Sequence, residues 1–359
     1  MVFMNRSFEN GSVKLDDASI MITGGTGSFG RQMVRTLLSR YKLRRLVVFS
    51  RDELKQYDLS VEFPTHRHAC LRYFIGDVRD ASRLEMAMRD IDYVIHAAAL
   101  KQVPTAEYNP FECINTNVHG AENVVRAVLR SDVKKVVALS TDKAASPINL
   151  YGASKLASDK IFVAANNLSG SKRTLFSVVR YGNVIGSRGS VIPLFERLIR
   201  ERAQELPITD ARMTRFTITL QQGVDFVLSS LDMMHGGEIF VPKIPSMRIT
   251  DLAYAMAPHF THRIIGIRPG EKLHEVMITE DDARTTLEMQ DRYIVEPAFG
   301  PEWTRTGHGG NGLDRVPEAF RYGSDTNPEF LSLEQIRALL TATSSSALLE
   351  PARAQPALH

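Results

Sequence analysis

The stretch TGGTGSFG at residues 23–30 links an apolar run, Ser19–Thr23, to a helix-forming segment. Its glycines at positions 24, 27 and 30 allow a tight turn, a close approach of the backbone to a pyrophosphate, and close packing of the helix on the strand. Phosphates would then meet the free N–H groups at the helix N-terminus. The stretch therefore predicts a dinucleotide site. A P-loop is excluded, because Arg31 and Gln32 stand where it requires Lys and Ser or Thr.

Outward from this stretch, short apolar strands alternate with helical segments. The expected strands are Ser19–Thr23, Arg45–Ser50, Leu71–Gly76, Asp92–Ala97, Lys135–Ser140 and Leu175–Tyr181. The expected helices include Gly30–Ser39, Ser82–Arg89, Cys113–Leu129 and Ala153–Asn166. Strands that are apolar almost throughout are typical of a parallel sheet covered on both faces. The alternation predicts an α/β fold with a Rossmann-type, doubly wound parallel sheet.

After about Gly182 the pattern becomes irregular, with many Pro and Gly residues. We expect helices at Ile192–Arg202 and Leu220–Met234, a strand at Glu238–Val241, and a helix that opens at Thr250 and is capped by its hydroxyl. The chain thus divides into a Rossmann domain at 15–182 and a smaller α/β region at 183–335. This second region is expected to be mainly substrate-binding, with some segments returning to the main sheet. The Ser-, Ala- and Pro-rich stretch 341–359 is predicted to be a disordered tail.

Composition limits the partners and the compartment. Lys and Arg number 44 against 41 Asp and Glu, and they are spread along the chain, so no nucleic-acid surface is expected. Cys70 and Cys113 lie outside any paired motif, and His66 and His68 lack a fourth ligand, so we expect neither disulfide nor metal. There is no signal peptide and no apolar stretch of about 20 residues, which predicts a cytoplasmic protein without membrane association.

The ends of the strands supply the other expected cofactor contacts. Where NAD-binding units usually place an acidic residue for the ribose 2′-hydroxyl, this chain has Ser50 and Arg51, which favour the 2′-phosphate of NADP. Asp52 leaves NAD as the alternative. The expected cofactor contacts are Gly24, Thr26, Gly27, Ser28, Phe29, Gly30, Ser50, Arg51, Asp52, Lys55, Asp77, Val78, Ala97, Ala98, Lys101, Tyr151 and Lys155.

Two polar segments carry the candidate catalytic groups. The fifth strand leads into Thr141-Asp142-Lys143, and Tyr151 and Lys155 open the next helix. The last two lie on one helical face because they are four residues apart. An ammonium group beside a phenol lowers the phenol pKa, which suits Tyr151 to act as a base for a sugar hydroxyl. Lys155 would also hold the nicotinamide ribose.

Together, the glycine motif, the polar end of the fifth strand and the Tyr-x-x-x-Lys pair resemble the extended short-chain dehydrogenase/reductase family. A closer resemblance runs from about Ser19 to Pro297. It rests on SRDELKQ at 50–56, HAAALKQVPTAEYNP at 96–110, STDKAASPINLYGASK at 140–155, RYGNVIGSRGSVIP at 180–193, PITDARMTRF at 207–216, GGEIFVPKIPSMRITDLA at 236–253 and GIRPGEKLHE at 266–275. This series is similar to the inverting UDP-N-acetylglucosamine 4,6-dehydratases that open pseudaminic acid synthesis. Thr217 departs from the family pattern, which has an aromatic residue there.

The resemblance implies an NADP-dependent lyase that converts UDP-N-acetylglucosamine into a UDP-2-acetamido-2,6-dideoxy-4-keto-hexose with inversion at carbon 5. Tyr151 and Thr141 would take the 4-hydroxyl proton, and Lys143 would take the proton on carbon 5. Asp142 would protonate the departing 6-hydroxyl. The last two roles require a lowered pKa for Lys143 and a raised one for Asp142. The implied substrate contacts are Lys101, Asn183, Arg215, Arg268 and Glu271, and a homo-oligomer is also implied.

Three other functions remain open at this point. A retaining 4,6-dehydratase is the nearest. A UDP-sugar 4-epimerase would share the cofactor site and Tyr151, but it needs no acid and base aimed at carbons 6 and 5, so Asp142 and Lys143 favour a dehydratase. A nonenzymatic NADP-sensing regulator is the most distant, since such proteins typically lose the Tyr/Lys pair that is intact here.

Overall fold

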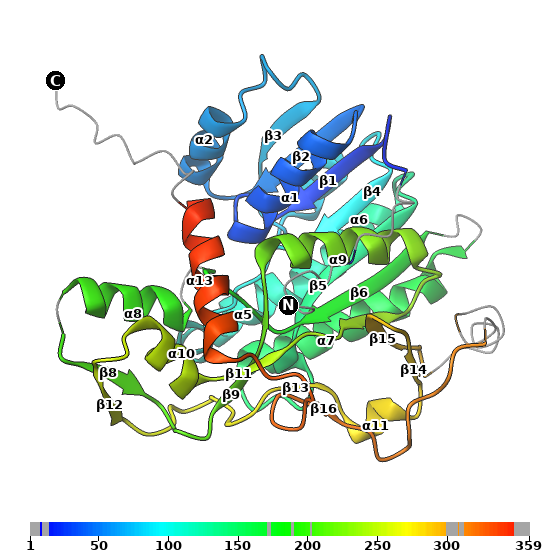
Figure 1. The fold of residues 1–359 in the computed structure, drawn as a ribbon. Coiled ribbons are helices and arrows are strands. Elements are labelled where there is room, and N and C mark those ends of the chain that lie inside the picture. The colour runs from blue at the N-terminus through cyan, green and yellow to red at the C-terminus, as the bar shows by residue number, and fades with distance from the viewer. Residues whose placement is uncertain are drawn as a thin grey trace, which may run out of the picture.

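The computed structural model describes residues 8, 14–170, 174–187, 190–201, 203–298, 308 and 312–347 of the 359-residue chain. At its centre lies a nine-stranded sheet with the order β14-β15-β10-β6-β5-β4-β1-β2-β3 (Figure 1). The strands from β10 to β3 run parallel to one another. Strand β15 is antiparallel to β10, and β14 is antiparallel to β15. The predicted Rossmann-type sheet is confirmed.

The six strands expected from the first half of the chain all form. They are β1 (Ser19–Thr23), β2 (Arg45–Ser50), β3 (Leu71–Ile75), β4 (Tyr93–His96), β5 (Lys135–Thr141) and β6 (Leu175–Tyr181). Three more strands join the sheet from the second half: β10 (Ile239–Pro242), β14 (Thr286–Glu288) and β15 (Arg292–Val295). The main sheet therefore extends across the boundary that the sequence places near Gly182, and some later segments return to it as expected.

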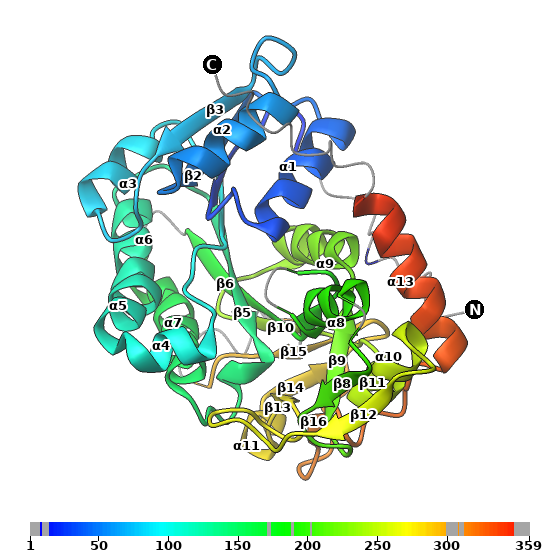
Figure 2. The same ribbon diagram turned by 90° about the vertical axis from the view of Figure 1, so that its left-hand side faces the viewer.

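Helices cover both faces of this sheet, as Figure 2 shows. One face carries α1 (Ser28–Arg40), which packs against α9 (Leu220–Met233), and the other carries α3 (Ala81–Ala87), α6 (Gly120–Leu129) and α7 (Leu150–Ala165). Arg40 Nη1 lies 2.7 Å from Asp225 Oδ1 and so ties α1 to α9. The short helix α2 (Glu53–Glu62) was not among the predicted helices; it begins where Asp52 accepts a hydrogen bond of 3.0 Å from the backbone N–H of Lys55.

The helix expected at Cys113–Leu129 is interrupted. It consists of α5 (Pro110–Ile114), the π-helical turn η1 (Asn115–His119) and α6, and is preceded by α4 (Val103–Tyr108). Within η1, the Asn117 side chain accepts a hydrogen bond from Leu100 N–H (2.8 Å) and donates to Leu100 C=O and Ser154 Oγ (both 2.9 Å). The π turn thereby anchors the loop after β4, and such turns occur frequently at functional sites.

Strand β1 occupies the point at which the order of the sheet reverses. It pairs in parallel with β2 on one side and with β4 on the other, so the chain builds outward in both directions. In open α/β sheets, ligands bind outside the carboxyl ends of the strands at such a point. The segments expected to hold a cofactor, 23–30 after β1 and 97–101 after β4, both lie there.

A smaller region packs beside the carboxyl ends of the strands. Its strands are β7 (Asn183–Val184), β8 (Glu205–Ile208), β9 (Thr214–Ile218), β11 (Ser246–Arg248), β12 (Thr261–Ile264), β13 (Val276–Ile278) and β16 (Tyr322–Gly323). Its helices are α8 (Val191–Arg200), α10 (Ile249–Met256), α11 (Glu280–Ala283) and α13 (Leu333–Ala347). The strands form the small sheets β11-β9-β7, β12-β8 and β13-β16. Separate apolar clusters around Phe195 and around Ile336 hold the helices on these sheets.

Two predictions for this region are wrong. The chain passes from β11 into α10 at Arg248, and the backbone N–H of Ile249 bonds Met213 C=O at 3.1 Å, so Thr250 lies inside the helix and does not cap it. The disordered tail was predicted to begin at residue 341, but α13 continues through Ala347. Ile336 in this helix packs with Leu252 of α10. Residues 348–359 of that tail lie outside the described part. No helix in the described ranges is long and apolar enough to span a membrane.

Candidate active site

The glycine loop packs as tightly as the sequence predicts. Gly24 has φ +66°, and a Cβ added there would lie 2.8 Å from both N and Cα of Ala98. A Cβ on Gly30 would lie 2.5 Å from Cα of Gly25, so α1 rests directly on the loop. Gly27 is the N-cap of α1, and no side chain among the described residues caps this helix. An α1 N-terminus without a side-chain cap is the kind of helix terminus that binds phosphate.

The remaining residues of the loop connect it to its neighbours. Thr26 Oγ1 is hydrogen-bonded to Ser50 Oγ at 2.7 Å, which joins the ends of β1 and β2. Ser28 and Phe29 open α1, and the Phe29 ring stacks on Tyr181 with centroids 6.5 Å apart. Backbone N–H of Ala97 donates to Thr23 C=O at 3.1 Å. The structure thus brings the predicted contacts of the first and fourth strands together.

At the end of β2, the acidic Asp52 and the basic Arg51 make different contacts. Asp52 caps α2 and also pairs with the ammonium group of Lys55, so its carboxylate is directed into that helix. Arg51 is half-exposed, and its Nη1 lies 3.4 Å from Asp77 Oδ2. Asp77 also accepts hydrogen bonds from Arg79, which together with Arg51 holds the pKa of the Asp77 carboxyl low despite its partial burial.

Two predicted cofactor contacts occupy quite different settings. Val78 is buried, and a Cβ added to Gly120 in α6 would lie 2.8 Å from its Cγ2, so the Val78 side chain packs against α6. Lys101 is exposed in the loop directly after Leu100, the residue that Asn117 anchors.

Tyr151 and Lys155 lie in the first turns of α7 and are almost completely buried. Asn149 starts this helix by accepting a hydrogen bond from Gly152 N–H at 2.7 Å. The Lys155 ammonium donates to Leu139 C=O at 2.7 Å rather than to the phenol. Burial raises the pKa of Tyr151 to about 12, against the opposing influence of the Lys143 charge and a hydrogen bond with Thr141. The predicted lowering of the Tyr151 pKa by Lys155 is therefore wrong, because burial outweighs the neighbouring positive charge.

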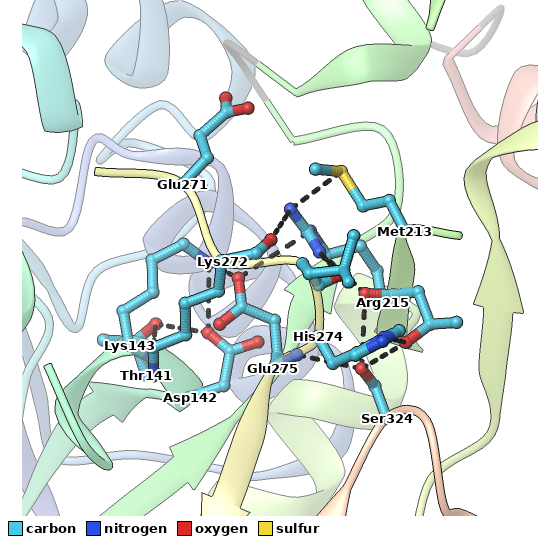
Figure 3. A network of polar contacts seen from close by, with 12 residues as sticks. Thr141, Asp142, Lys143, Met213, Arg215, Glu271, Lys272, His274, Glu275 and Ser324 are labelled. Atoms are coloured by element: carbon cyan, nitrogen blue, oxygen red, sulfur yellow. Dashed lines mark hydrogen bonds and ion pairs between the residues drawn. The ribbon is translucent and has the colours of Figure 1, made fainter. Parts of the chain in front are cut away.

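Strand β5 ends at Thr141 and passes into a 3₁₀ turn, η2 (Asp142–Ala144), which carries the acid and base candidates. Thr141 Oγ1 donates to Asp142 Oδ1 at 3.0 Å, and the Lys143 ammonium donates to the same oxygen at 3.1 Å. Figure 3 shows that Glu275 approaches the Lys143 ammonium as well. Its Oε1 lies 3.1 Å from Lys143 Nζ.

The charges of this cluster shift the three pKa values in different directions. Burial, reinforced by the Glu275 charge, raises the pKa of Asp142, as its predicted role as an acid requires. Burial alone would also raise the pKa of Glu275, but Lys143 and Arg215 hold it below its ordinary value. Burial disfavours the Lys143 ammonium, yet the carboxyl groups of Asp142 and Glu275 keep its pKa above the ordinary value. The predicted lowering for Lys143 is wrong here, because two carboxyl groups outweigh its desolvation.

Arg215 in β9 belongs to the same network (Figure 3). Its Nη1 donates to the carbonyls of Thr214 (2.7 Å) and Leu273 (3.1 Å), its Nη2 donates to Lys272 C=O (2.9 Å), and its Nε lies 3.7 Å from Glu275 Oε1. Arg215 therefore fixes the 272–275 segment beside β9. Its binding to diphosphate stays a prediction.

Three other predicted substrate residues lie in segments next to those that form this cluster. Arg268 Nε is 3.2 Å from Glu271 Oε1, within a turn whose Gly270 C=O accepts a 2.8 Å hydrogen bond from Asn149 Nδ2. This bond ties the turn to the start of the helix that carries Tyr151. Asn183 Nδ2 in β7 is buried and has no hydrogen-bond partner among the described residues. Such a donor is costly to leave unpaired, so it is a candidate ligand contact.

Sequence reasoning missed Glu275, Lys272 and Asn149. Glu275 and Lys272 stand in the segment GIRPGEKLHE, but the only local signal there was their charge. Lys272 donates to Ala145 C=O at 2.6 Å, just after η2. No cluster of three His, Cys, Asp or Glu side chains suited to a metal ion is found in the described ranges.

Comparison with known proteins places the chain in a family. The profile described as "Polysaccharide biosynthesis protein" matches residues 20–297. The chain is 56% identical over 329 residues, 90% of its length, to a Campylobacter jejuni protein called UDP-N-acetylglucosamine 4,6-dehydratase (inverting), of which 98% is covered.

Solved structures show the same fold. The protein Pen from Bacillus thuringiensis superposes with a TM-score of 0.83 at 38% identity, covering 92% of this chain and 99% of Pen. A dTDP-glucose 4,6-dehydratase from Streptomyces venezuelae, solved with NAD bound, superposes with a TM-score of 0.63 at 22% identity, covering 71% of this chain and 86% of that one. Since the profile matches most of the chain and the Campylobacter relative is similar over nearly all of it, the chain belongs to the polysaccharide biosynthesis protein family.

Proposed function

We propose that this protein is a UDP-N-acetylglucosamine 4,6-dehydratase that inverts carbon 5 and works with a bound nicotinamide dinucleotide. The observation that carries the proposal is the pair of Asp142, which is buried and has a raised pKa, with Lys143, next to Tyr151. The sequence identity of 56% to the inverting dehydratase of Campylobacter jejuni supports the substrate and the stereochemistry.

The residues at the sheet switch point fit a dinucleotide. A Cβ at Gly24 would fill the space beside Ala98, and the N-terminus of α1 is open at Gly27, so backbone donors are available where a pyrophosphate would lie. Ser50 and Arg51 would hold the adenosine ribose, and Tyr151 and Lys155 would hold the nicotinamide ribose. When bound, the dinucleotide would supply a temporary oxidation at carbon 4 and a reduction at carbon 6.

The chain's own groups can be assigned to the proton transfers up to the loss of water. Tyr151, hydrogen-bonded to Thr141, would take the proton of the 4-hydroxyl as a phenolate, so it must first release its own proton to solvent against its raised pKa. A ketone at carbon 4 acidifies the hydrogen on carbon 5, so an amine is a sufficient base for its removal. Lys143 would be that base. Because Asp142 and Glu275 favour its ammonium form, Lys143 must first release a proton, and its partly exposed side chain allows that proton to pass to solvent.

Asp142 would supply the proton that turns the departing 6-hydroxyl into water. Its carboxyl group is fully buried, and its Oδ2 has no hydrogen-bond partner among the described residues. A protonated Oδ2 would therefore be available to a ligand. Asn183, Arg268, Glu271 and Lys101 would hold the nucleotide and sugar, with Arg215 on the diphosphate side.

We also propose NADP as the dinucleotide, because the capping Asp52 is directed into α2 while the positive Arg51 stands at the end of β2.

A homo-oligomer is proposed because Tyr108 of α4 and Phe111 of α5 are 87% and 79% exposed, and a second copy would cover them. Action in the cytoplasm, in pseudaminic acid synthesis, follows from the resemblance, and the unbridged Cys70 and Cys113 accord with a reducing compartment.

The test is a reaction in heavy water with UDP-N-acetylglucosamine and the purified protein, without added reductant. The product should be a 6-deoxy-4-keto sugar with deuterium at carbon 5 and inverted configuration there. Hydrogen from carbon 4 should appear at carbon 6, which a substrate deuterated at carbon 4 reports. A 4-epimer as the only product would establish an epimerase instead, and retention at carbon 5 from the first turnovers would establish a retaining dehydratase.

A further inference from the structure

Glu275 reaches the acid–base pair from the second half of the chain. It directly precedes β13, and its side chain is about as buried as that of Asp142. Its Oε1 lies 3.1 Å from Lys143 Nζ, the same distance that separates this ammonium group from Asp142 Oδ1. A single ammonium group therefore stands between two buried carboxyl groups, as Figure 3 shows.

The site holds Glu275 rigidly. Its backbone N–H donates to Ser324 Oγ at 2.9 Å, and Arg215 Nε lies 3.7 Å from its Oε1. One oxygen of each carboxyl group, Oε2 of Glu275 and Oδ2 of Asp142, is buried without a hydrogen-bond partner among the described residues. Two buried carboxylates that share one ammonium group repel each other, so one of them retains a proton.

The surroundings determine which carboxyl group retains it. Lys143 and Arg215 both contact Glu275, and Lys272 contributes a third positive charge nearby. In contrast, Asp142 has Lys143 as its one ion-pair partner among the described residues. The negative charge is thus better stabilised on Glu275, which leaves the proton on Asp142.

We propose that Glu275 is a positioning residue that keeps Asp142 protonated by carrying the negative charge beside Lys143. This inference rests on the proposed function, in which Asp142 is the acid for the 6-hydroxyl. Without the Glu275 charge, Asp142 is the remaining carboxyl group beside Lys143 and ionises. Lys143 then has one ionised carboxyl neighbour, as it has in the wild type, so its ability to act on carbon 5 is unchanged. No proton is left for the departing hydroxyl.

The experiment uses Glu275→Gln in the protein with its dinucleotide bound. In heavy water, dehydration should slow about 10²-fold, the usual contribution of a general acid. Exchange at carbon 5 should persist, so recovered UDP-N-acetylglucosamine should carry deuterium there. Asp142→Asn should behave in the same way, whereas Lys143→Ala should lose exchange and dehydration together.

Two further variants separate this role from a merely structural one. Glu275→Asp retains the charge and should restore much of the dehydration rate. Glu238→Gln neutralises an equally buried carboxylate that bonds Ser177 Oγ at 2.5 Å and lies before β10, at the opposite end of the strands from η2. Its dehydration rate should stay at the wild-type value even if its melting temperature falls.

Infrared spectroscopy detects the protonated carboxyl group of Asp142 without turnover. The measurement is therefore valid whether or not the sugar assignment is right. At neutral pH the wild type should show the band of a protonated carboxylic acid, which should be absent from both Asp142→Asn and Glu275→Gln. The inference is overturned if that band survives in Glu275→Gln, if this variant dehydrates as fast as the wild type, or if it loses exchange and dehydration equally. Failure of the wild type to dehydrate UDP-N-acetylglucosamine would instead overturn the proposed function.

Discussion

Lys143 and Glu275 come from opposite halves of the chain, and their side chains meet at 3.1 Å in a buried cluster. Lys143 stands in η2 after β5, whereas Glu275 precedes β13 in the smaller region. Their contact closes that region over the carboxyl end of the main sheet, and Lys272 strengthens it by bonding Ala145 C=O at 2.6 Å. The cluster that holds the proposed acid and base is therefore assembled by two parts of the fold together.

Replacement of Lys143 should separate the proposed steps. Lys143→Ala leaves Tyr151, Thr141 and Lys155 in place, so oxidation at carbon 4 remains possible while removal of the carbon 5 proton does not. Absorbance of the reduced dinucleotide should rise after substrate is added and persist, and a 4-ketone should be trapped on the enzyme. Tyr151→Phe is the control and should show no such absorbance. Dehydration by Lys143→Ala at nearly the wild-type rate would show that another group is the base.

Arg51 is expected to determine the choice of dinucleotide. Arg51→Ala should weaken NADP binding by about 1.5–3 kcal/mol, the value of a hydrogen bond to a charged group, and should change NAD binding little. Titration of both dinucleotides by calorimetry measures this difference. Arg79→Ala removes the other arginine that contacts Asp77, at 2.8 Å, and serves as the control for indirect effects through that carboxylate. An equal loss for NADP and NAD in Arg51→Ala would assign Arg51 a structural role.

Asn149 should couple the 268–271 turn to the catalytic helix. Its Oδ1 caps α7 and its Nδ2 donates to Gly270 C=O at 2.8 Å. Asn149→Asp keeps the cap but loses the donor, so KM for the UDP-sugar should rise several-fold with little change in melting temperature. Asn149→Ala loses both and should also destabilise the protein by about 1 kcal/mol. If Asn149→Asp leaves KM unchanged, the anchored turn does not bind the substrate.

Buried His96 should make the protein sensitive to acid. Burial, helped by the charge of Lys155, lowers the pKa of His96 to about 3, and its Nδ1 is hydrogen-bonded to Thr23 Oγ1 at 2.8 Å. A lowered folded-state pKa contributes stability above the unfolded value of about 6.5 that is lost as the pH falls toward 3. His96→Gln should thus be less stable than the wild type at pH 7, and the difference should shrink with acidification. Denaturant unfolding at several pH values checks this, and a constant difference would contradict it.

The cofactor half of the site was largely predictable from the sequence. The bounds of β1, β2 and β6 follow from local signals: runs of apolar residues, glycine spacing and the order of strand and helix. The carboxyl ends of parallel neighbours meet at one edge, so the loops after β1 and β4 had to converge. Asp142 and Lys143 directly follow β5, and Tyr151 and Lys155 lie in α7, so the elements that carry these four candidates were predicted as well.

Tertiary structure alone determined the electrostatics of the site. A pKa depends on burial and on charges within a few ångströms, and for Lys143 the decisive charges are those of Asp142, its neighbour in the chain, and of Glu275, which is remote in sequence. The sequence revealed only the neighbouring Asp142, so it predicted the wrong direction for the pKa shift of Lys143. The predicted direction of the pKa shift of Asp142 is confirmed. The addition of β10, β15 and β14 to the main sheet likewise depended on long-range strand pairing. Local residue patterns thus specified the elements, and contacts between distant segments specified the protonation of the groups they bring together.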